Sequence, residues 1–199
     1  MHALADAAEL RVLGCLIEKQ RTTPDQYPLS VNAIRLACNQ STNRDPVVQY
    51  DEQDVRGALQ RLSGKGWARL ASGAGSRAVK YRHLFDEALS LSDAEISLLA
   101  VLMLRGAQTL GELKARSERL HRLSLADVDA TLRALAEREL VEHVPRRPGQ
   151  KEERWRHLLG TDDPEAPAQP AAAAPVDASV EERLRKLEER VAALEDLLA

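Results

Sequence analysis

The strongest constraint on the fold is an internal repeat, because two similar stretches of sequence with their segments in the same order are expected to adopt the same fold. The pattern Val-x-x-x-Leu-x-x-Leu begins at Val55 and again at Val128. The segment around Glu9 is matched around Glu95, and residues 81–85 (Tyr-Arg-His-Leu-Phe) are matched by 155–159 (Trp-Arg-His-Leu-Leu). The matched positions follow one order, so the sequence predicts two diverged copies of one domain.

Each copy predicts three helices, because apolar residues recur at spacings of three and four behind a residue that can cap a helix. The expected ranges in the first copy are 7–19, 31–39 and 52–65, and in the second copy 93–104, 110–119 and 125–137. The expected N-caps are Asp6, Ser30, Asp51, Ser92, Thr109 and Ser124. An acidic residue three positions after most of these caps is typical of a capping box.

A β-hairpin is expected after the third helix of each copy. Residues 67–70 and the alternating Val79, Tyr81 and His83 flank a turn-rich segment, as do 140–144 and 154–158 in the second copy. Three helices and a hairpin make a winged helix. The predicted fold class is therefore mainly α with small β-hairpins (α+β), arranged as winged-helix domains at 1–88 and 89–160.

Four further segments resemble one family of proteins. They are Gly14 to Gln20, Thr22 to Ser30, Asn39 to Pro46 and Leu104 to Thr109. These stretches resemble the YceH-like family of uncharacterised bacterial proteins over about residues 7–160. The resemblance implies tandem winged-helix domains, and it implies no particular biochemical role.

Composition excludes several classes of protein. Hydrophobic residues make up 44% and charged residues 30% of 199 residues, which is ordinary for a globular protein. The longest strongly apolar run, 96–104, is far shorter than the roughly 20 residues of a membrane span. No signal peptide is recognisable, so a cytoplasmic location without membrane contact is expected. Cys15 and Cys38 are interpreted as small buried thiols.

Net charge is distributed unevenly along the chain. Lys and Arg exceed Asp and Glu by two in residues 1–88 and by one in 89–160, whereas 161–199 carries a net charge of −6. The body is thus slightly basic and the tail acidic. This balance permits nucleic acid binding without requiring it.

The main functional hypothesis is binding of double-stranded DNA by a transcriptional regulator, with the third helix in the major groove and the hairpin on the backbone. The first hairpin offers Arg69, Arg77, Lys80 and Arg82. The expected DNA-contacting set is Arg56, Gln60, Arg61, Lys65, Arg77, Lys80, Arg146, Arg147 and Lys151. Glu52 and Asp54 argue against it, because their carboxylates would repel phosphates, although they also suit the helix dipole.

The alternative is a scaffold that binds a protein partner without DNA, since polar helix faces are usually only solvated. Enzymatic activity is not expected. The five histidines have no metal-ligand spacing with the cysteines, so neither a metal site nor a cofactor is predicted. His83 and His157 occupy equivalent positions, which favours a role in hairpin packing.

The segment from Ser41 to Pro46 allows two interpretations. Its Asn, Asp and Ser side chains favour local turns, so a structural loop is expected. A contact site built on Asn43 and Arg44 is the alternative.

The C-terminal part predicts a Pro/Ala-rich linker at 161–178 and a coiled-coil helix at 179–199. The heptad positions are filled by Val180, Leu184, Leu187, Val191, Leu194 and Leu198. In a parallel pair Arg183 and Arg190 face partner glutamates, which predicts a parallel dimer through Leu184, Leu187, Val191, Leu194 and Leu198. The alternative is an amphipathic helix that docks on the rest of the chain or on another protein. The helix at 93–104 is apolar almost all round, so we expect it to contact the first copy or a second subunit as well.

Overall fold

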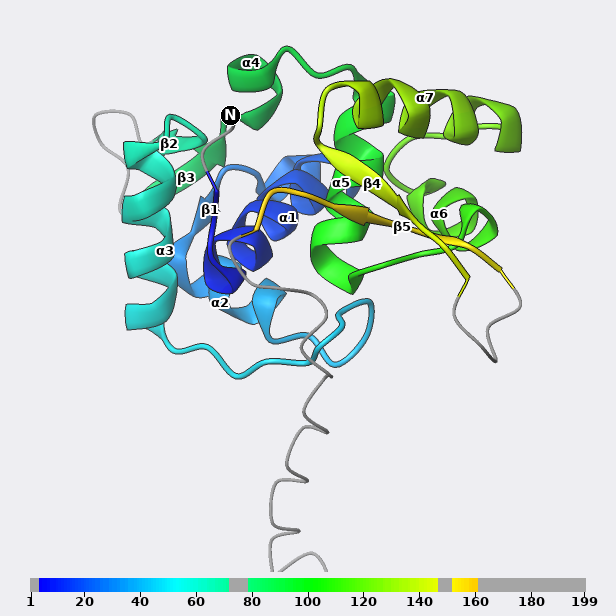
Figure 1. The fold of residues 1–199 in the computed structure, drawn as a ribbon. Helices are drawn as coiled ribbons and strands as arrows, with labels where there is room; N and C mark the ends of the chain where they lie inside the picture. The colour runs from blue at the N-terminus through cyan, green and yellow to red at the C-terminus, as the bar shows by residue number, and fades with distance from the viewer. Residues whose placement is uncertain (1–3, 72–78, 147–151, 161–199) are drawn as a thin grey trace, which may run out of the picture. The chain divides into compact units, whose positions relative to one another are not determined.

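The computed structural model describes residues 4–71, 79–146 and 152–160 (Figure 1). The first half contains α1 (Ala7–Thr22), the 3-10 helix η1 (Pro24–Gln26), β1 (Leu29–Ser30), α2 (Val31–Cys38), α3 (Glu52–Gly64), β2 (Ala68–Leu70) and β3 (Lys80–His83). After α4 (Phe85–Leu89), the second half contains α5 (Asp93–Arg105), α6 (Leu110–Ser117), α7 (Leu125–Glu137), β4 (Val141–Val144) and β5 (Arg154–His157). The described residues belong to one unit, Met1–Asp163, and the expected linker and coiled-coil helix lie outside them.

The six predicted helices begin where the sequence places them, whereas α4 and η1 were not predicted. Asp6 accepts a hydrogen bond from the backbone N–H of Glu9 at 2.8 Å, and the Glu9 carboxylate accepts one from the N–H of Asp6 at 2.9 Å. The same reciprocal capping box starts α3, α5, α6 and α7, while Ser30 caps α2 with a single bond. All six N-caps are confirmed, because capping depends on residues only three positions apart.

The strands form two small antiparallel sheets. β2 and β3 pair as the predicted first hairpin, and β4 and β5 pair as the second. A short strand that the sequence did not reveal, β1, adds to β3 and gives the order β1-β3-β2. Gln108 takes the corresponding place in the second half through a single bridge to Trp155. The predicted α+β class is confirmed.

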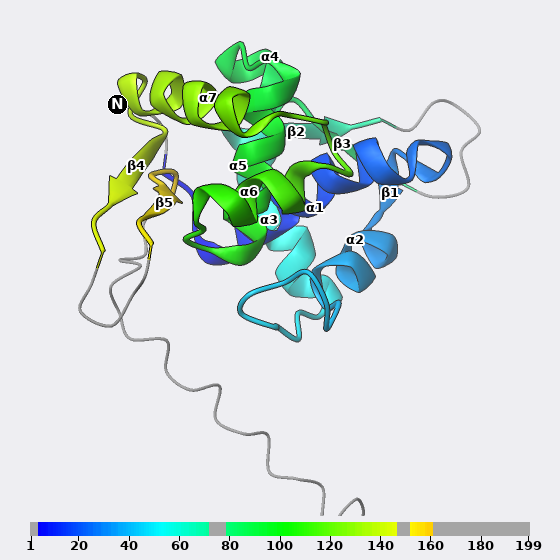
Figure 2. The same cartoon turned by 90° about the vertical axis from the view of Figure 1, so that its right-hand side faces the viewer.

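Helices α1 and α5 lie side by side and join the two halves (Figure 2). All residues from Glu9 to Glu18 and from Ile96 to Leu104 are buried. A Cβ atom placed on Gly14 would lie 2.9 Å from Cγ of Leu104, so the absence of a side chain permits this close approach. The expectation that the helix at 93–104 is buried on more than one side is therefore confirmed, and its second partner is the first half.

Other contacts hold the first hairpin in place and join the start of the first half to the end of the second. Trp67 and Phe85 pack edge to face with ring centroids 4.8 Å apart. The backbone N–H of Ala5 donates to the carbonyl of Leu159 at 2.8 Å, which links the start of the first half to the end of the second. Cys15 and Cys38 are free, buried thiols, as predicted. Within the described residues, no helix is both long and apolar enough to cross a membrane.

Candidate functional site

The first turn of α3 uses its carboxylates locally. Asp51 and Asp54 form the capping box, with bonds of 2.8 and 2.9 Å to each other's backbone N–H. Glu52 forms an ion pair with Arg56 one turn later, at 3.1 Å. These acids stabilise the helix start, where negative charge also complements the helix dipole.

The outer face of α3 is divided between exposed and engaged side chains. Val55, Ala58, Leu59 and Leu62 are buried, whereas Arg56 and Gln60 are exposed. Arg61 lies 2.7 Å from a carboxylate oxygen of Asp6, and Nζ of Lys65 lies 2.5 Å from Oε1 of Glu9. Arg61 and Lys65 thus bind α3 to the start of α1. Of the four predicted contact residues of α3, Arg56 and Gln60 are the most available to a ligand.

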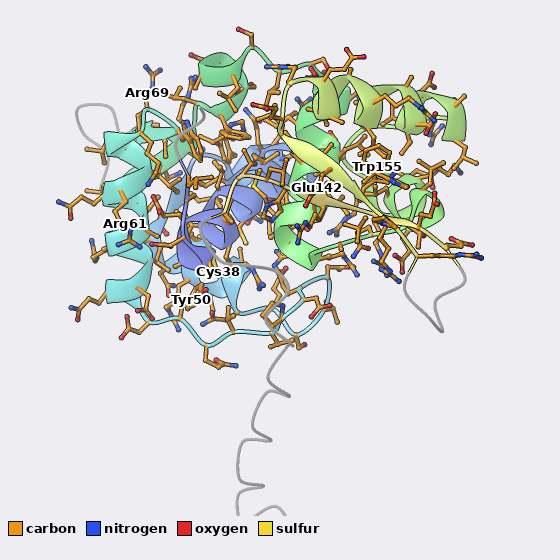
Figure 3. The ribbon with its side chains drawn as sticks, viewed as in Figure 1. Cys38, Tyr50, Arg61, Arg69, Glu142 and Trp155 are labelled. Atoms are coloured by element: carbon orange, nitrogen blue, oxygen red, sulfur yellow. The ribbon has the colours of Figure 1, made fainter. Side chains whose placement is uncertain are left out.

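The hairpin places two arginines opposite each other. In the register of β2 and β3, Arg69 is the direct partner of Arg82, so both side chains lie on the same face. Arg69 is exposed (Figure 3), and Arg82 forms an ion pair with Glu87 of α4. Like charges directly opposite each other cost stability. Two arginines in this position are therefore a feature that folding alone does not favour.

The second half has an ion pair where the first half has two arginines. In β4 and β5 the equivalent partners are Glu142 and Arg156, and their side chains form an ion pair. The sequence shows the same contrast over the whole region. Between Asp54 and Asp86 it contains Arg56, Arg61, Lys65, Arg69, Arg77, Lys80 and Arg82 but no acidic residue. The matching stretch from Val128 to Leu159 includes Asp129, Glu137, Glu139, Glu142, Glu152 and Glu153.

The predicted residues of the second hairpin are only partly described. Arg146 is exposed and lines an open groove of about 770 Å³ between α7 and the hairpin. The other walls of this groove include Asp129, Arg133, His143, Glu153 and Trp155. Arg133 is bonded to Asp129 at 2.8 Å, and His143 contacts Glu153 at 2.9 Å. Because these charges alternate in sign, the groove is poorly suited to a phosphate backbone.

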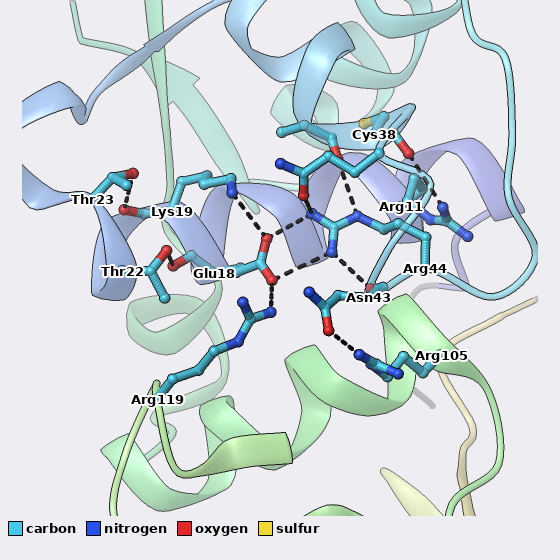
Figure 4. A network of polar contacts seen from close by, with 12 residues as sticks. Arg11, Glu18, Lys19, Thr22, Thr23, Cys38, Asn43, Arg44, Arg105 and Arg119 are labelled. Atoms are coloured by element: carbon cyan, nitrogen blue, oxygen red, sulfur yellow. Dashed lines mark hydrogen bonds and ion pairs between the residues drawn. The ribbon is translucent and has the colours of Figure 1, made fainter.

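Arg44 of the predicted contact loop is buried, and all five of its N–H groups are engaged (Figure 4). They donate to the carbonyls of Ala37 and Asn43, to the side chain of Gln40 and twice to the carboxylate of Glu18. This placement favours the structural interpretation of the loop. Asn43 accepts a hydrogen bond from Arg105 of α5, so the loop also contacts the second half.

The cations of this network set the pKa of Glu18. Desolvation by itself raises the pKa of Glu18, but hydrogen bonds and charge from Arg44, with Lys19 and Arg119, outweigh it and hold the pKa below its usual value. Arg119 reaches this carboxylate from the second half, beyond α6. One buried carboxylate is therefore shared by cations from both halves.

Several predicted residues cannot be placed. Outside the described residues lie Arg77, Arg147, Lys151, Leu184, Leu187, Val191, Leu194 and Leu198. Lys80 is half-buried at the start of β3. Sequence reasoning missed the pairing of Arg61 and Lys65 with Asp6 and Glu9, because no local pattern joins residues more than fifty positions apart. In the part of the chain that the structure describes, no group of His, Cys, Asp and Glu has the arrangement of a metal site.

Comparison with known proteins identifies close relatives. Residues 5–150 match the family model described as "Protein of unknown function, DUF480". The chain is 44% identical over 200 residues to the UPF0502 protein YceH of Salmonella paratyphi C, covering 96% of this chain and 93% of the relative. It is 46% identical to a UPF0502 protein of Serratia proteamaculans, covering 96% and 92%. The resemblance to the YceH-like family is thus confirmed, and the chain belongs to the DUF480 family.

Proposed function

We propose that the protein is a non-enzymatic, cytoplasmic regulator whose two halves are winged-helix domains, and that the first half binds double-stranded DNA. The exposed residues of α3, Arg56 and Gln60, would face the major groove, and Arg69 and Arg82 of the hairpin would contact phosphates. The observation that carries the proposal is the pairing of Arg69 with Arg82 where the second half has Glu142 with Arg156. A phosphate group would supply a counter-charge to this pair of arginines.

The proposal assigns different tasks to the two halves. The first half presents a hairpin without acidic residues, whereas acidic residues accompany the basic ones in the second half. The second half instead contributes α5, which packs on α1. The first half would therefore contact DNA, and the second would position it within the assembly.

Binding to unrelated duplexes, measured by fluorescence anisotropy at about 50 mM and about 200 mM salt, tests the proposal. Affinity is expected to fall steeply with salt, because phosphate contacts release counterions. The sharpest variant is Arg69→Glu, which recreates the Glu142–Arg156 pair of the second half. This variant should keep the fold, because Glu at position 69 can form an ion pair with Arg82. It should strongly reduce the affinity for duplex DNA.

Single substitutions to alanine separate the contributions of individual side chains to DNA affinity. Arg56→Ala is expected to weaken binding and to reduce the preference for one base sequence over another, as for a residue that contacts base edges in the major groove. Arg133→Ala is the matched control, because Arg133 is also an exposed arginine paired to an acid one turn earlier, on the equivalent helix α7. No binding at low salt, or equal losses for Arg56→Ala and Arg133→Ala, would count against DNA binding by the first half.

Self-association is the second part of the proposal, through a parallel coiled coil at 179–199. The heptad charges support it, because Arg183 and Arg190 would face Glu188 and Glu195 of the partner. In the full chain, Leu187→Ala with Leu194→Ala should lower the mass measured by light scattering at a fixed concentration. Glu189→Ala, at an outward heptad position, is the control; an unchanged mass for the leucine variant would contradict the proposal.

A scaffold function without DNA remains the alternative, and the groove beside α7 is the observation that favours it. Its alternating charges and the edge-to-face pair of His143 and Trp155 suit a polypeptide better than a phosphate backbone. A pull-down with the full chain, with and without nuclease, distinguishes the two. Partners that resist nuclease but are lost in Arg133→Glu would favour the scaffold.

A further inference from the structure

A second basic site lies where the two halves meet, and it shares no residue with the α3 and hairpin surface. It is a cavity of about 370 Å³ beside the end of α5 and α6. The cavity is lined by Asn43, Arg105, Ala115, Arg116, Glu118 and Arg119. Asn43 belongs to the first half and the other five residues to the second.

Arg105 is held in place without a carboxylate partner among the described residues. Its guanidinium donates to the side-chain oxygen of Asn43. Asn43 has a positive φ of 61°, and its carbonyl accepts from Arg44 at 2.8 Å, so one residue orients two arginines. Burial lowers the pKa of Arg105, and the charges of Arg116, Arg119 and Arg44 lower it further. Arg105 is therefore a fixed cation in an already positive environment.

The carboxylates near the cavity are too few for its arginines. Arg116 lies 3.5 Å from Glu112, but Glu112 also contacts Arg154 at 3.1 Å and caps α6. Arg119 contacts Glu18, a carboxylate that already accepts two bonds from Arg44. Glu118 is the one carboxylate in the lining, against three arginines. Glu112 and Glu18 are each shared with other cations, so positive charge remains in excess around the cavity.

We propose that this cavity binds a small molecule bearing a phosphate group, held by Arg105, Arg116 and Arg119. Guanidinium groups match phosphate oxygens in geometry, and a tetrahedral dianion offers oxygens to three arginines at once. A carboxylate has only two oxygens and one negative charge, so it matches the three arginines and their excess positive charge less well. The cavity volume lies near the lower end of the range for small-molecule sites.

The ligand would bridge the halves, because Asn43 and the arginines come from different halves. A ligand that binds only the folded chain raises its apparent stability, and the gain grows with the logarithm of the free ligand concentration above Kd. The site therefore predicts that phosphate compounds stabilise the joined arrangement of both halves. This inference is independent of DNA binding, because the α3 and hairpin residues take no part in it.

Isothermal titration of the full chain with inorganic phosphate and with pyrophosphate, at ionic strength matched with chloride, tests the proposal. Saturable binding at one site is expected, with pyrophosphate the tighter ligand and a parallel rise in melting temperature. Arg105→Gln and Arg116→Gln should each weaken binding about tenfold or more, the effect of losing one charge-assisted contact. Arg133→Gln, an exposed and acid-paired arginine outside the cavity, should bind as the wild type does.

Three results would overturn the proposal. The first is the absence of saturable binding of either anion in the millimolar range. The second is equal weakening by Arg105→Gln and Arg133→Gln, which would indicate general charge screening. The third is a loss of duplex DNA affinity in Arg105→Gln without any phosphate or pyrophosphate binding, which would assign the cavity to a nucleic acid backbone. The DNA proposal is tested separately, by the duplex affinity of Arg69→Glu.

Discussion

The carboxylate of Glu18 accepts hydrogen bonds from both terminal nitrogens of Arg44, at 3.3 and 2.6 Å, and both side chains are almost completely buried. Glu18 belongs to α1, while Arg44 lies in the loop before α3. Arg119 of the second half contacts the same carboxylate. This pair therefore connects the loop, the central helix and the second half.

Arg44→Ala is expected to lower the free energy of unfolding by about 3 kcal/mol, because a buried carboxylate loses its main partner. Urea denaturation followed by circular dichroism measures the change. Arg35→Ala is the control, since among the described residues its side chain makes only an exposed bond to Asn32, and the change in stability should be less than about 0.5 kcal/mol. An Arg44→Ala chain that is as stable as this control, but binds DNA or a protein partner less well, would instead support the contact site built on Asn43 and Arg44.

Stability should fall as the pH is lowered from about 6.5 to 4, because of two histidines. Burial lowers the pKa of His83 to about 4, and it does the same for His157. In this window the unfolded chain binds protons that the folded chain excludes, so the folded state loses stability as pH falls. For His83 the loss approaches about 3 kcal/mol at pH 4. His157 should add to this loss, because burial lowers its pKa in the same direction.

Denaturation at several pH values checks this expectation. In His83→Gln the free energy of unfolding should depend less steeply on pH between 6.5 and 4, by a slope that corresponds to nearly one bound proton. A slope that is identical in the wild type and in His83→Gln would show that His83 is protonated in the folded state.

Gly14→Ala is expected to destabilise the chain by about 1 to 2 kcal/mol, even though alanine favours helices by about 1 kcal/mol over glycine. The new methyl group would lie 2.9 Å from Cγ of Leu104, where α1 crosses α5. Gly111→Ala in α6 meets no atom within 4 Å and should be neutral or stabilising. Thermal and urea denaturation give both values, and a stable Gly14→Ala chain would mean that α5 can move away from α1.

Glu139→Gly should stabilise the protein by about 1 kcal/mol. Glu139 follows α7 with a positive φ of 56°, a conformation that costs energy for residues other than glycine. The repeat places Gly66, with a φ of 73°, at the matching position after α3. Glu137→Gly is the contrasting variant, because it introduces glycine at the last helical residue of α7 and should cost up to about 1 kcal/mol. Equal destabilisation by both substitutions, measured by denaturation, would contradict the repeat argument.

Much of the local structure was predictable from the sequence. The six N-caps, the three helices of each half and both hairpins lie close to their predicted positions. Capping boxes and apolar spacings act over three or four residues, so the sequence displays them directly. The strand β1 could not be predicted, because two residues gain their strand conformation only by pairing with β3, some fifty positions later.

The sequence by itself thus determined where six of the helices and both hairpins form, and it showed one order of segments recurring along the chain. Only the tertiary structure decided which charges remain available. It buried Arg44, engaged Arg61 and Lys65 with acids of α1, and left Arg69 exposed opposite Arg82. The reason is physical: the free energy of a charged side chain depends on its burial and on the charges that distant segments bring near it. Local periodicity contains neither quantity.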